Sequence, residues 1–292
     1  MSDDPSRAQN QATCRPVRES LSGYARGIIG GLIFSLPLLY TMEVWWAGFT
    51  TDPQRLLVGV VATMILLLGY NCFAGIRHDT CWAEVVIDSV EEFGLGMVLS
   101  ACVLALLGRI DTSMSLVEVA GKVIMEAILI AIGVSVGTAQ LGSSSGSEND
   151  DKNEDDPGRR ASFPGQIVIA TCGAVLFATN VAPTEEIVVL AIEMAPWKVI
   201  ALALFSVVLG AIILYSSDFR SSEQYAPRDG IGSMLWGTAM TYTVALLSSA
   251  AILWFFGRYD DADLGVKISQ AVVLAFPATL GASAGRLLLQ SQ

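Results

Sequence analysis

The sequence predicts an all-α, polytopic membrane protein in which eight transmembrane helices form two parallel four-helix repeats. Three observations lead to this prediction: the composition is apolar, the apolar runs match the thickness of a bilayer, and the two halves of the chain align. Of the 292 residues, 53% are hydrophobic and 15% are charged, whereas a soluble domain carries about 25% charged residues. This composition excludes a soluble enzyme, a nucleic-acid-binding protein and a disordered chain.

Eight apolar runs have the length of a membrane span, because about 20 apolar helical residues cross the hydrocarbon core. They cover residues 24–48, 55–76, 86–107, 116–139, 165–190, 197–215, 231–256 and 265–288. No signal-peptide cleavage pattern follows the first run, so we expect it to stay in the membrane. The chain then divides into a polar tail at 1–22, a first repeat at 23–141, a linker at 142–162 and a second repeat at 163–292.

The linker and the basic residues predict the topology. Residues 142–162 change from Gly/Ser-rich to acidic, which is typical of a solvated spacer. Of the 17 Lys and Arg residues, eleven fall on the side of the tail and linker and six on the other. The positive-inside rule therefore places both termini and the linker on the cytoplasmic side of the membrane. The net charge of −11 argues against a nucleic-acid partner, and the lipid bilayer is the partner we expect.

An internal repeat relates the two halves. A shift of 143 positions aligns Phe34 with Phe177, Thr41 with Thr184, Glu43 with Glu186, Val44 with Ile187, Pro53 with Pro196, Arg55 with Lys198, and Arg77 with Arg220. A shift of 149 aligns G-R-I-D at 108–111 with G-R-Y-D at 257–260, and a shift of 148 aligns 133–137 with 281–285. Four spans are an even number, so both repeats keep the same orientation about an axis along the membrane normal.

The repeated glycines predict close helix packing. Gly133 and Gly137 are four residues apart, as are Gly281 and Gly285, and such small-residue faces let membrane helices approach closely. A pore lining is the alternative interpretation. The same faces are compatible with a homo-oligomer, and the G-R-x-D motifs are typical of capped outer loops.

Two T-x-E motifs are the first candidate ion site. They are Thr41-Met42-Glu43-Val44 and Thr184-Glu185-Glu186-Ile187, and each lies near a proline that frees a backbone carbonyl. Carbonyl, hydroxyl and carboxylate oxygens are the ligands that hard cations prefer, so the two motifs could meet in one outer site. In the alternative interpretation they are hydrated helix ends, as the neighbouring Trp45 and Trp46 would suggest for interfacial anchors.

Glu126 is a deeper candidate, near the middle of the apolar run 123–129 and next to Lys122. A carboxyl group at this depth must be protonated, paired or hydrated. The second half has Leu274 or Ala275 at the aligned position. Glu126 is therefore either part of a single ion path or a neutral acid that hydrogen-bonds between helices.

Acidic residues also open the third span, where Glu84, Asp88, Glu91 and Glu92 share one broad helical face. This face predicts either a vestibule that attracts cations or an amphipathic helix entry at the membrane surface. In the first interpretation Glu91 and Glu92 form the inner mouth of the ion path.

Motifs for catalysis and cofactor binding are missing from the sequence. It has one histidine, His78, five cysteines without a C-x-x-C pair, and no Walker or H-E-x-x-H motif. The G-x-S-x-G pattern at 133–137 lies inside an apolar span and lacks the strand–turn context of a nucleophile elbow. We therefore expect no enzyme and no cofactor, and the identity of any bound metal stays unknown.

The segments 34–46 (F-S-L-P-L-L-Y-T-M-E-V-W-W) and 176–187 (L-F-A-T-N-V-A-P-T-E-E-I) resemble a family of bacterial integral membrane proteins that has no assigned activity. The resemblance covers both halves and implies a membrane location but no mechanism. The residues themselves favour a channel or transporter for a small cation, a proton or a metal, that uses intramembrane carboxylates. The alternative is a non-transporting membrane scaffold, sensor or assembly factor.

Overall fold

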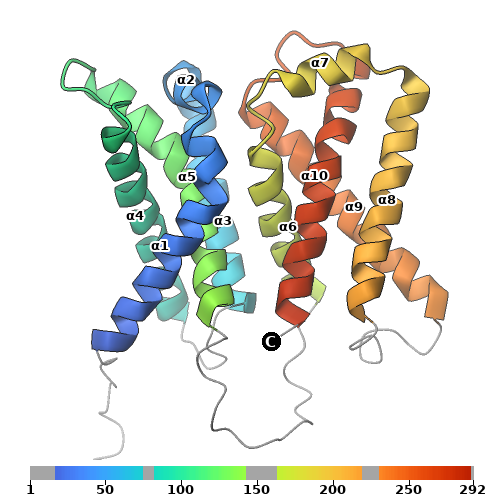
Figure 1. The fold of residues 1–292 in the computed structure, drawn as a ribbon, viewed down its shortest axis with the longest axis horizontal. Helices are drawn as coiled ribbons and strands as arrows, with labels where there is room; N and C mark the ends of the chain where they lie inside the picture. The colour runs from blue at the N-terminus through green and yellow to red at the C-terminus, as the bar shows by residue number, and fades with distance from the viewer. Residues whose placement is uncertain (1–16, 75–81, 143–162, 219–229, 291–292) are drawn as a thin grey trace, which may run out of the picture.

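The computed structural model of the chain describes residues 17–74, 82–142, 163–218 and 230–290, and these residues form ten helices and no strand (Figure 1). Residues 1–16, the loop with Arg77 and His78, most of the linker (143–162) and the loop with Arg220 lie outside the described residues. The first helix begins at Val17, inside the segment that we expected to be a polar tail.

In the first half, a central helix is surrounded by four others. The half consists of α1 (Val17–Leu39), α2 (Met42–Thr50), α3 (Pro53–Ala74), α4 (Trp82–Leu106) and α5 (Leu116–Gly142). Helix α5 packs against the other four, and 83% of its apolar stretch is buried inside the protein. It is therefore the core of this half, whereas α3 and α4 are long and apolar but mostly exposed at their surfaces.

The second half has the same order of one long, one short and three long helices. It consists of α6 (Phe163–Thr179), α7 (Glu186–Glu193), α8 (Pro196–Asp218), α9 (Gly230–Phe255) and α10 (Leu264–Gln290). Helix α10 packs against the other four, as α5 does in the first half. Figure 1 shows α1 and α6 running in the same direction, each ending at the short helix that follows it.

Two of the expected spans are not continuous helices. The expected span 24–48 breaks between α1 and α2 with a bend of 87°, and the expected span 165–190 breaks at residues 180–185, between α6 and α7. Prolines lie at both breaks, Pro37 in the last turn of α1 and Pro183 in the turn after α6. Proline favours a break because it lacks a backbone N–H donor and its ring crowds the preceding turn of the helix. Six helices (α3, α4, α5, α8, α9 and α10) are long and apolar enough to cross a membrane, and α1 with α2 would make a seventh span. The expected number of eight is therefore not established by helix length and composition.

The repeated glycines lie where helices cross, as the packing interpretation predicts. A Cβ atom built on Gly30 of α1 would lie 2.3 Å from the Cα atom of Gly137 on α5. In the second half, a Cβ atom on Gly173 of α6 would lie 2.2 Å from the carbonyl oxygen of Gly281 on α10. Gly30 and Gly173 are themselves aligned by the shift of 143. Both central helices therefore approach the first helix of their half at backbone contact distance.

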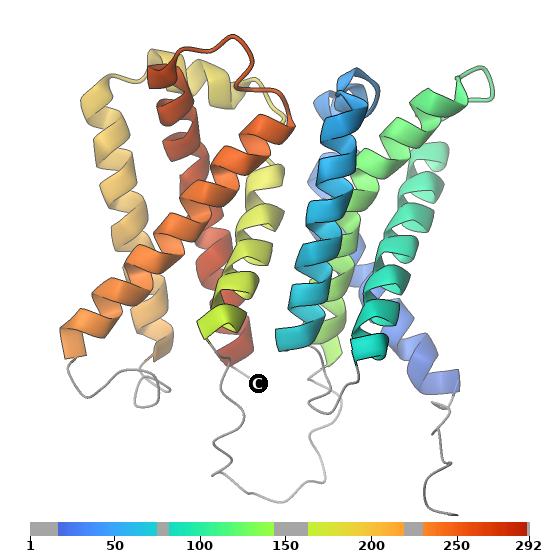
Figure 2. The ribbon, with the colours of Figure 1, turned by 180° about the vertical axis from the view of Figure 1, so that it is seen from behind.

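The two halves meet mainly through α3 and α6, which lie side by side in the middle of the molecule (Figure 2). Gly69 of α3 faces Val168 of α6, and Gly165 of α6 faces Phe73 of α3. Near the end that bears α2 and α7, Phe255 of α9 packs against Gly59 of α3. A buried apolar cluster of α3, α5 and α6 fills the space between these contacts.

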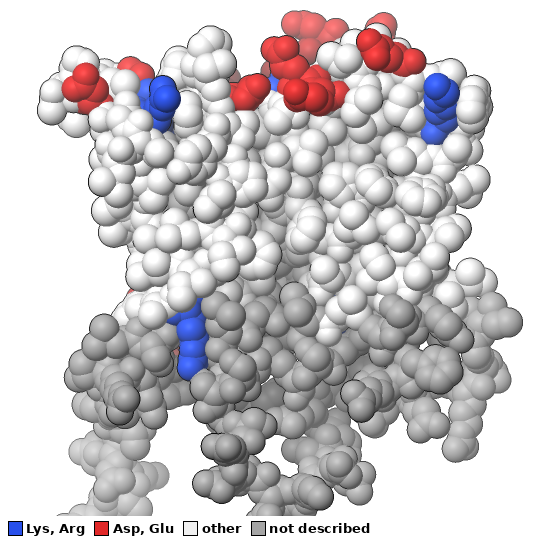
Figure 3. Space-filling view, in the orientation of Figure 1, with Lys and Arg blue, Asp and Glu red and all other residues white. Residues whose placement is uncertain are grey.

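Charge and apolar surface are separated along the helix axes. Figure 3 shows acidic side chains gathered at the end that bears α2 and α7, above a broad band without charge. Large apolar side chains are exposed on the long helices, among them Leu57 and Ile65 of α3 and Ile200 and Leu204 of α8. An exposed apolar band of this kind is what the hydrocarbon core of a bilayer covers.

Candidate functional site

The most unusual side chain of the first half is Glu126, on the central helix α5. Its exposed fraction is 0%, and neither carboxyl oxygen has a hydrogen-bond partner among the described residues. The neighbouring Met125 belongs to one buried apolar cluster with Leu38, and Ile130, one turn further along, belongs to another with Leu39. The residues that flank Glu126 along α5 therefore pack in apolar clusters with the last residues of α1.

Lys122 lies one turn before Glu126 but does not form an ion pair with it. Its ammonium group is 2.9 Å from Oε1 of Glu118, donates a hydrogen bond to the carbonyl oxygen of Arg109, and lies 5.3 Å from the centre of the Phe49 ring. These partners draw the ammonium group toward the end that bears α2. The only cation that the sequence placed beside Glu126 is thus engaged elsewhere.

A second polar group lies further along the same half and contains Glu92. The amide nitrogen of Asn71 on α3 donates hydrogen bonds to Oε2 of Glu92 at 2.8 Å and to the hydroxyl of Ser89 at 3.0 Å, both on α4. The hydroxyl of Ser135 on α5 donates to Oδ1 of Asn71 at 3.4 Å. Three helices thus place a carboxylate, an amide and two hydroxyls together, and we call these four residues the Asn71–Glu92 cluster.

Glu91, the neighbour of Glu92, faces a different partner. It accepts a hydrogen bond of 3.1 Å from the hydroxyl of Tyr24 on α1 and is exposed. The acidic face at the start of α4 is therefore divided, because Glu92 contacts the interior cluster and Glu91 contacts the outer surface of α1. Ser135 is nine residues from Glu126 on α5, which corresponds to roughly 14 Å along a helix.

The first T-x-E motif forms the start of α2. The Thr41 hydroxyl donates to the carbonyl oxygen of Pro37 at 2.6 Å, and the indole N–H of Trp45 donates to that of Leu39 at 3.0 Å. Two carbonyl groups at the break therefore already have donors. Glu43 is partly exposed in the first turn of α2, where a carboxylate interacts favourably with the helix dipole.

The second T-x-E motif forms the start of α7. Thr184 donates to the carbonyl oxygen of Val181 at 2.7 Å, while Glu185 and Glu186 are exposed. The backbone N–H of Glu186, the Thr184 hydroxyl and the nearby charge of Arg258 lower the pKa of Glu186 from its ordinary value. A guanidinium nitrogen of Arg258 also donates to the carbonyl oxygen of Pro183, so the oxygen set of this motif has local partners.

The structure places the two motifs on different halves. Helix α2 packs on α5 and α7 packs on α10, and no hydrogen bond or ion pair joins Glu43 to Glu186 among the described residues. No group of three or more His, Cys, Asp or Glu side chains in the described part of the chain is arranged to hold a metal ion. The proposed shared outer site thus stays a prediction that no contact supports.

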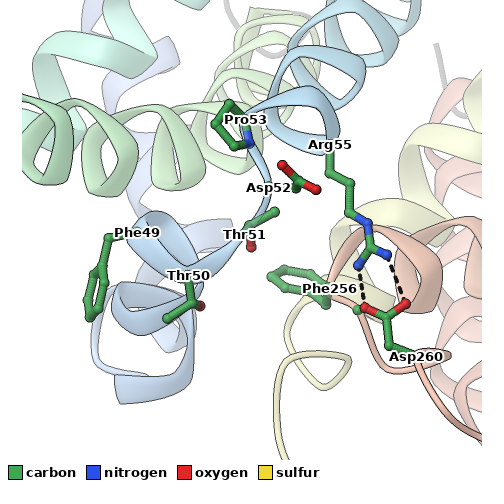
Figure 4. Close-up of a pocket in the computed structure, with 9 residues that line it drawn as sticks. Phe49, Thr50, Thr51, Asp52, Pro53, Arg55, Phe256 and Asp260 are labelled. Carbon is green, nitrogen blue, oxygen red and sulfur yellow. Dashed lines mark hydrogen bonds and ion pairs between the residues drawn. The ribbon is translucent and has the colours of Figure 1, made fainter.

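A pocket of 510 Å³ opens between the halves at the end that bears α2 and α7 (Figure 4). Its wall includes Asp52 and Arg55 from the start of α3 and Phe256 and Asp260 from the end of α9 and the following loop. The Arg55 guanidinium donates two hydrogen bonds to Asp260, at 2.7 and 2.8 Å, and it lowers the pKa of that carboxyl group. This bidentate ion pair joins the two halves.

Sequence reasoning missed two polar groups inside the bundle. Asn71 is an amide in an otherwise apolar helix, and that contrast was the available signal. Arg286 was considered only as one of the eleven basic residues on the side of the tail and linker, but its guanidinium is partly buried and donates to Gln166 of α6 at 2.9 Å and to Thr241 of α9 at 2.7 Å. Thr241 aligns with Glu92 at the shift of 149, so the halves differ in charge at this level.

The all-helical fold, the uncharged band and the buried carboxyl group define an integral membrane protein with several apolar helices. The chain belongs to the family described as "Putative integral membrane protein (DUF2391)", which matches residues 23–289. The family resemblance inferred from the two quoted segments is thereby confirmed. A search of curated proteins and a search of solved structures found no match.

Proposed function

We propose that the protein passes protons across the membrane through its first half. Glu126 is the proton-carrying group in the interior, and the Asn71–Glu92 cluster forms the inner end of the path. The observation that carries this proposal is the fully buried Glu126 carboxyl group, whose oxygens have no partner among the described residues. A carboxyl group buried without a partner is tolerated as the neutral acid, and intramembrane acids of this kind are typical of proton relays.

The surroundings of Glu126 favour a proton over a metal ion as the transported cation. A hard divalent cation takes about six or more oxygen ligands, whereas Glu126 is packed between residues of two apolar clusters. A proton needs only one carboxyl group and transient water. On this proposal Glu43 remains a candidate for the outer mouth, because α2 lies on α5 above Glu126. Thr41, Thr184, Glu185 and Glu186 would then contribute only to the outer surface.

The topology that goes with this function has eight spans in two parallel repeats. In it, α1 and α6 cross the membrane, α2 and α7 lie at the outer surface, and the tail, the linker and both termini are in the cytoplasm of a bacterial inner membrane. The matching order of helix lengths supports the duplication. So do the aligned glycine contacts of α1 with α5 and of α6 with α10.

Proton flux into vesicles tests the function. The purified full chain is reconstituted into liposomes that contain a pH-sensitive dye, and the internal pH is followed after an external acid step under a potassium–valinomycin potential. We expect Glu126→Gln to abolish the protein-dependent flux and Glu92→Gln to reduce it, whereas the control Glu193→Gln, at an exposed acid of α7, leaves it unchanged. Flux that is equal in wild type and Glu126→Gln would refute the proposal.

The alternative function is a non-transporting membrane scaffold, sensor or assembly factor. The apolar clusters of α5 with α1 near Glu126 favour this alternative. In it, these clusters serve only to hold α5 against α1. Wild-type vesicles without flux above empty liposomes would support this alternative. Wild-type flux that Glu126→Gln removes, while the variant keeps the wild-type helical content, would exclude it.

A further inference from the structure

We propose that α8 of one copy docks in the membrane against α1 and α4 of a second copy, with Lys198 paired to Asp111 across the contact. The arrangement would repeat between chains the way in which α3 docks against α6 and α9 within one chain. This inference does not depend on the proposed proton flux. It concerns a surface on each half that has no equivalent partner inside the chain.

The contact between the halves provides the template. At the end that bears α2 and α7, Arg55 at the start of α3 forms its bidentate ion pair with Asp260, and its guanidinium lies 5.6 Å from the centre of the Trp254 ring. Below this pair, Phe255 of α9 fills the space beside Gly59 of α3. The contact thus combines an ion pair at the surface with a large side chain against a glycine in the apolar band.

The aligned positions in the opposite halves carry the same charges. Arg55 aligns with Lys198 at the shift of 143, and Asp260 aligns with Asp111 at the shift of 149. Each basic residue is the third of a helix that begins with proline, since α3 begins at Pro53 and α8 at Pro196. Lys198 and Asp111 are both exposed.

The loops that carry the two aspartates begin with the same capping turn. Gly108 and Gly257 both adopt a left-handed conformation, with φ of 66° and 72°. Arg109 N donates to Leu104 O and Arg258 N donates to Leu253 O, which are the same bond five residues back. This capping motif fixes the chain direction after the helix. Beyond the cap the loops differ, since Asp260 N donates to Gly257 O whereas Asp111 O accepts from Met114 N. Asp111 and Asp260 thus follow their helices at the same number of residues after the cap.

Large and small residues are exchanged at the deeper of two apolar positions only, because at the outer position both aligned residues are leucines and Leu202 packs against the core of its own half. The pair Gly59 and Phe255 aligns with Leu202 and Leu106, and the pair Gly69 and Val168 aligns with Ile212 and Ala25. Leu106 is 87% exposed and Ile212 is 56% exposed. Within the chain, α3 provides the glycine at both positions, Gly59 and Gly69. In the proposed contact, α8 provides the large residue at the deeper position, Ile212, and α1 provides the small one, Ala25.

The chain cannot satisfy these positions by itself. Figure 1 shows α8 and the loop between α4 and α5 at opposite ends of the molecule, and Figure 2 shows the same from behind. One chain thus carries both charges of the proposed contact, Lys198 on α8 and Asp111 in the loop between α4 and α5, on opposite sides of the molecule. Because these charges are complementary, we identify the partner as a second copy of the chain. Such a contact is heterologous, so it closes into a ring or continues as a row.

Subunit counting in lipid vesicles tests the contact. Fluorescently labelled full chain is reconstituted at low density, and bleaching steps are counted for wild type, Lys198→Asp, Asp111→Lys and the double variant. We expect wild type to associate, each single reversal to reduce the associated fraction about threefold or more because attraction becomes repulsion, and the double variant to recover it. Glu193→Lys, a charge reversal at the same end of the molecule, is the control and should match wild type.

A steric variant tests the apolar part of the contact. Ala25→Trp adds a large side chain at an exposed position of α1, so we expect it to reduce association while the thermal unfolding of the protein is unchanged. The proposal is overturned by a monomeric wild type, by association that neither charge reversal changes, by a double variant that does not recover, or by Ala25→Trp that associates like wild type.

Discussion

Replacing Gly30 by alanine should destabilise the protein, because α1 and α5 touch through their backbones at this residue. The new Cβ atom would lie 2.3 Å from the Cα atom of Gly137, whereas carbon atoms in contact are about 3.5–4.0 Å apart. The helices must therefore separate locally by roughly 1.2–1.7 Å. Over-packing of this kind typically costs about 1–3 kcal/mol, and alanine returns about 0.5–1 kcal/mol of helix propensity. We expect a net loss of about 1–2 kcal/mol.

The free energy of unfolding can be measured by titrating the purified protein in mixed micelles with sodium dodecyl sulfate and following the far-ultraviolet circular dichroism. Gly94→Ala on α4 is the matched control, since a Cβ atom there meets nothing within 4 Å, and it should be neutral or slightly stabilising. Gly173→Ala should repeat the loss in the second half, where the Cβ atom meets the Gly281 carbonyl at 2.2 Å. If Gly30→Ala unfolds at the same detergent fraction as Gly94→Ala, the helices are not held at backbone contact.

Three further predictions concern individual groups. Glu126→Met should stabilise the protein by about 1–3 kcal/mol in the same titration, because it removes a buried polar group without partners; a loss of stability would show that the carboxyl group has a partner. The folded-state pKa of Asp260 is lowered by Arg55, so the stability that this pair contributes is present above the ordinary aspartate pKa of 3.8 and is lost as the pH falls through the folded-state value. The thermal stability of wild type should therefore fall more between about pH 5 and pH 2 (roughly 1–2 units on either side of that pKa) than the thermal stability of Asp260→Asn, and parallel pH profiles would contradict this. Gly108→Ala should cost about 1–2 kcal/mol from left-handed strain alone, whereas Gly257→Ala should cost more because its Cβ atom would also lie 3.0 Å from Arg55; equal losses would show that Arg55 moves away freely.

The sequence predicted the helical membrane fold well, because apolar length along a helix is a local property. It also predicted the glycine contacts and the capped loops, since small residues and glycine turns act through their own backbone. It did not predict that residues 24–48 and 165–190 break into two helices each. Pro37 and Pro183 were visible, but a proline can bend, kink or end a helix, and the packing of α2 and α7 on the central helices decides which.

The candidate site was predicted only in its residue types. Glu126 was identified from its depth alone, and the structure places it where the sequence suggested, in the interior. Glu92 was considered as part of either a cation vestibule or a helix entry at the membrane surface, whereas the structure shows its hydrogen bond with Asn71 of the preceding helix. That contact depends on how α3 and α4 are rotated about their axes, and the residue spacing within either helix does not predict this rotation.

Composition and hydropathy by themselves determined that this chain belongs in a membrane, where its six unbroken apolar helices (α3, α4, α5, α8, α9 and α10) begin and end to within about four residues, and which acids lie among apolar residues. The tertiary structure decided which of these acids have partners. It pairs Lys122 with Glu118 and Arg55 with Asp260, the second pair across the two halves, and it leaves the Glu126 carboxyl group without a hydrogen-bond partner among the described residues. The physical reason is that burial depends on a residue and its near neighbours along the helix, whereas an ion pair depends on where another helix is placed.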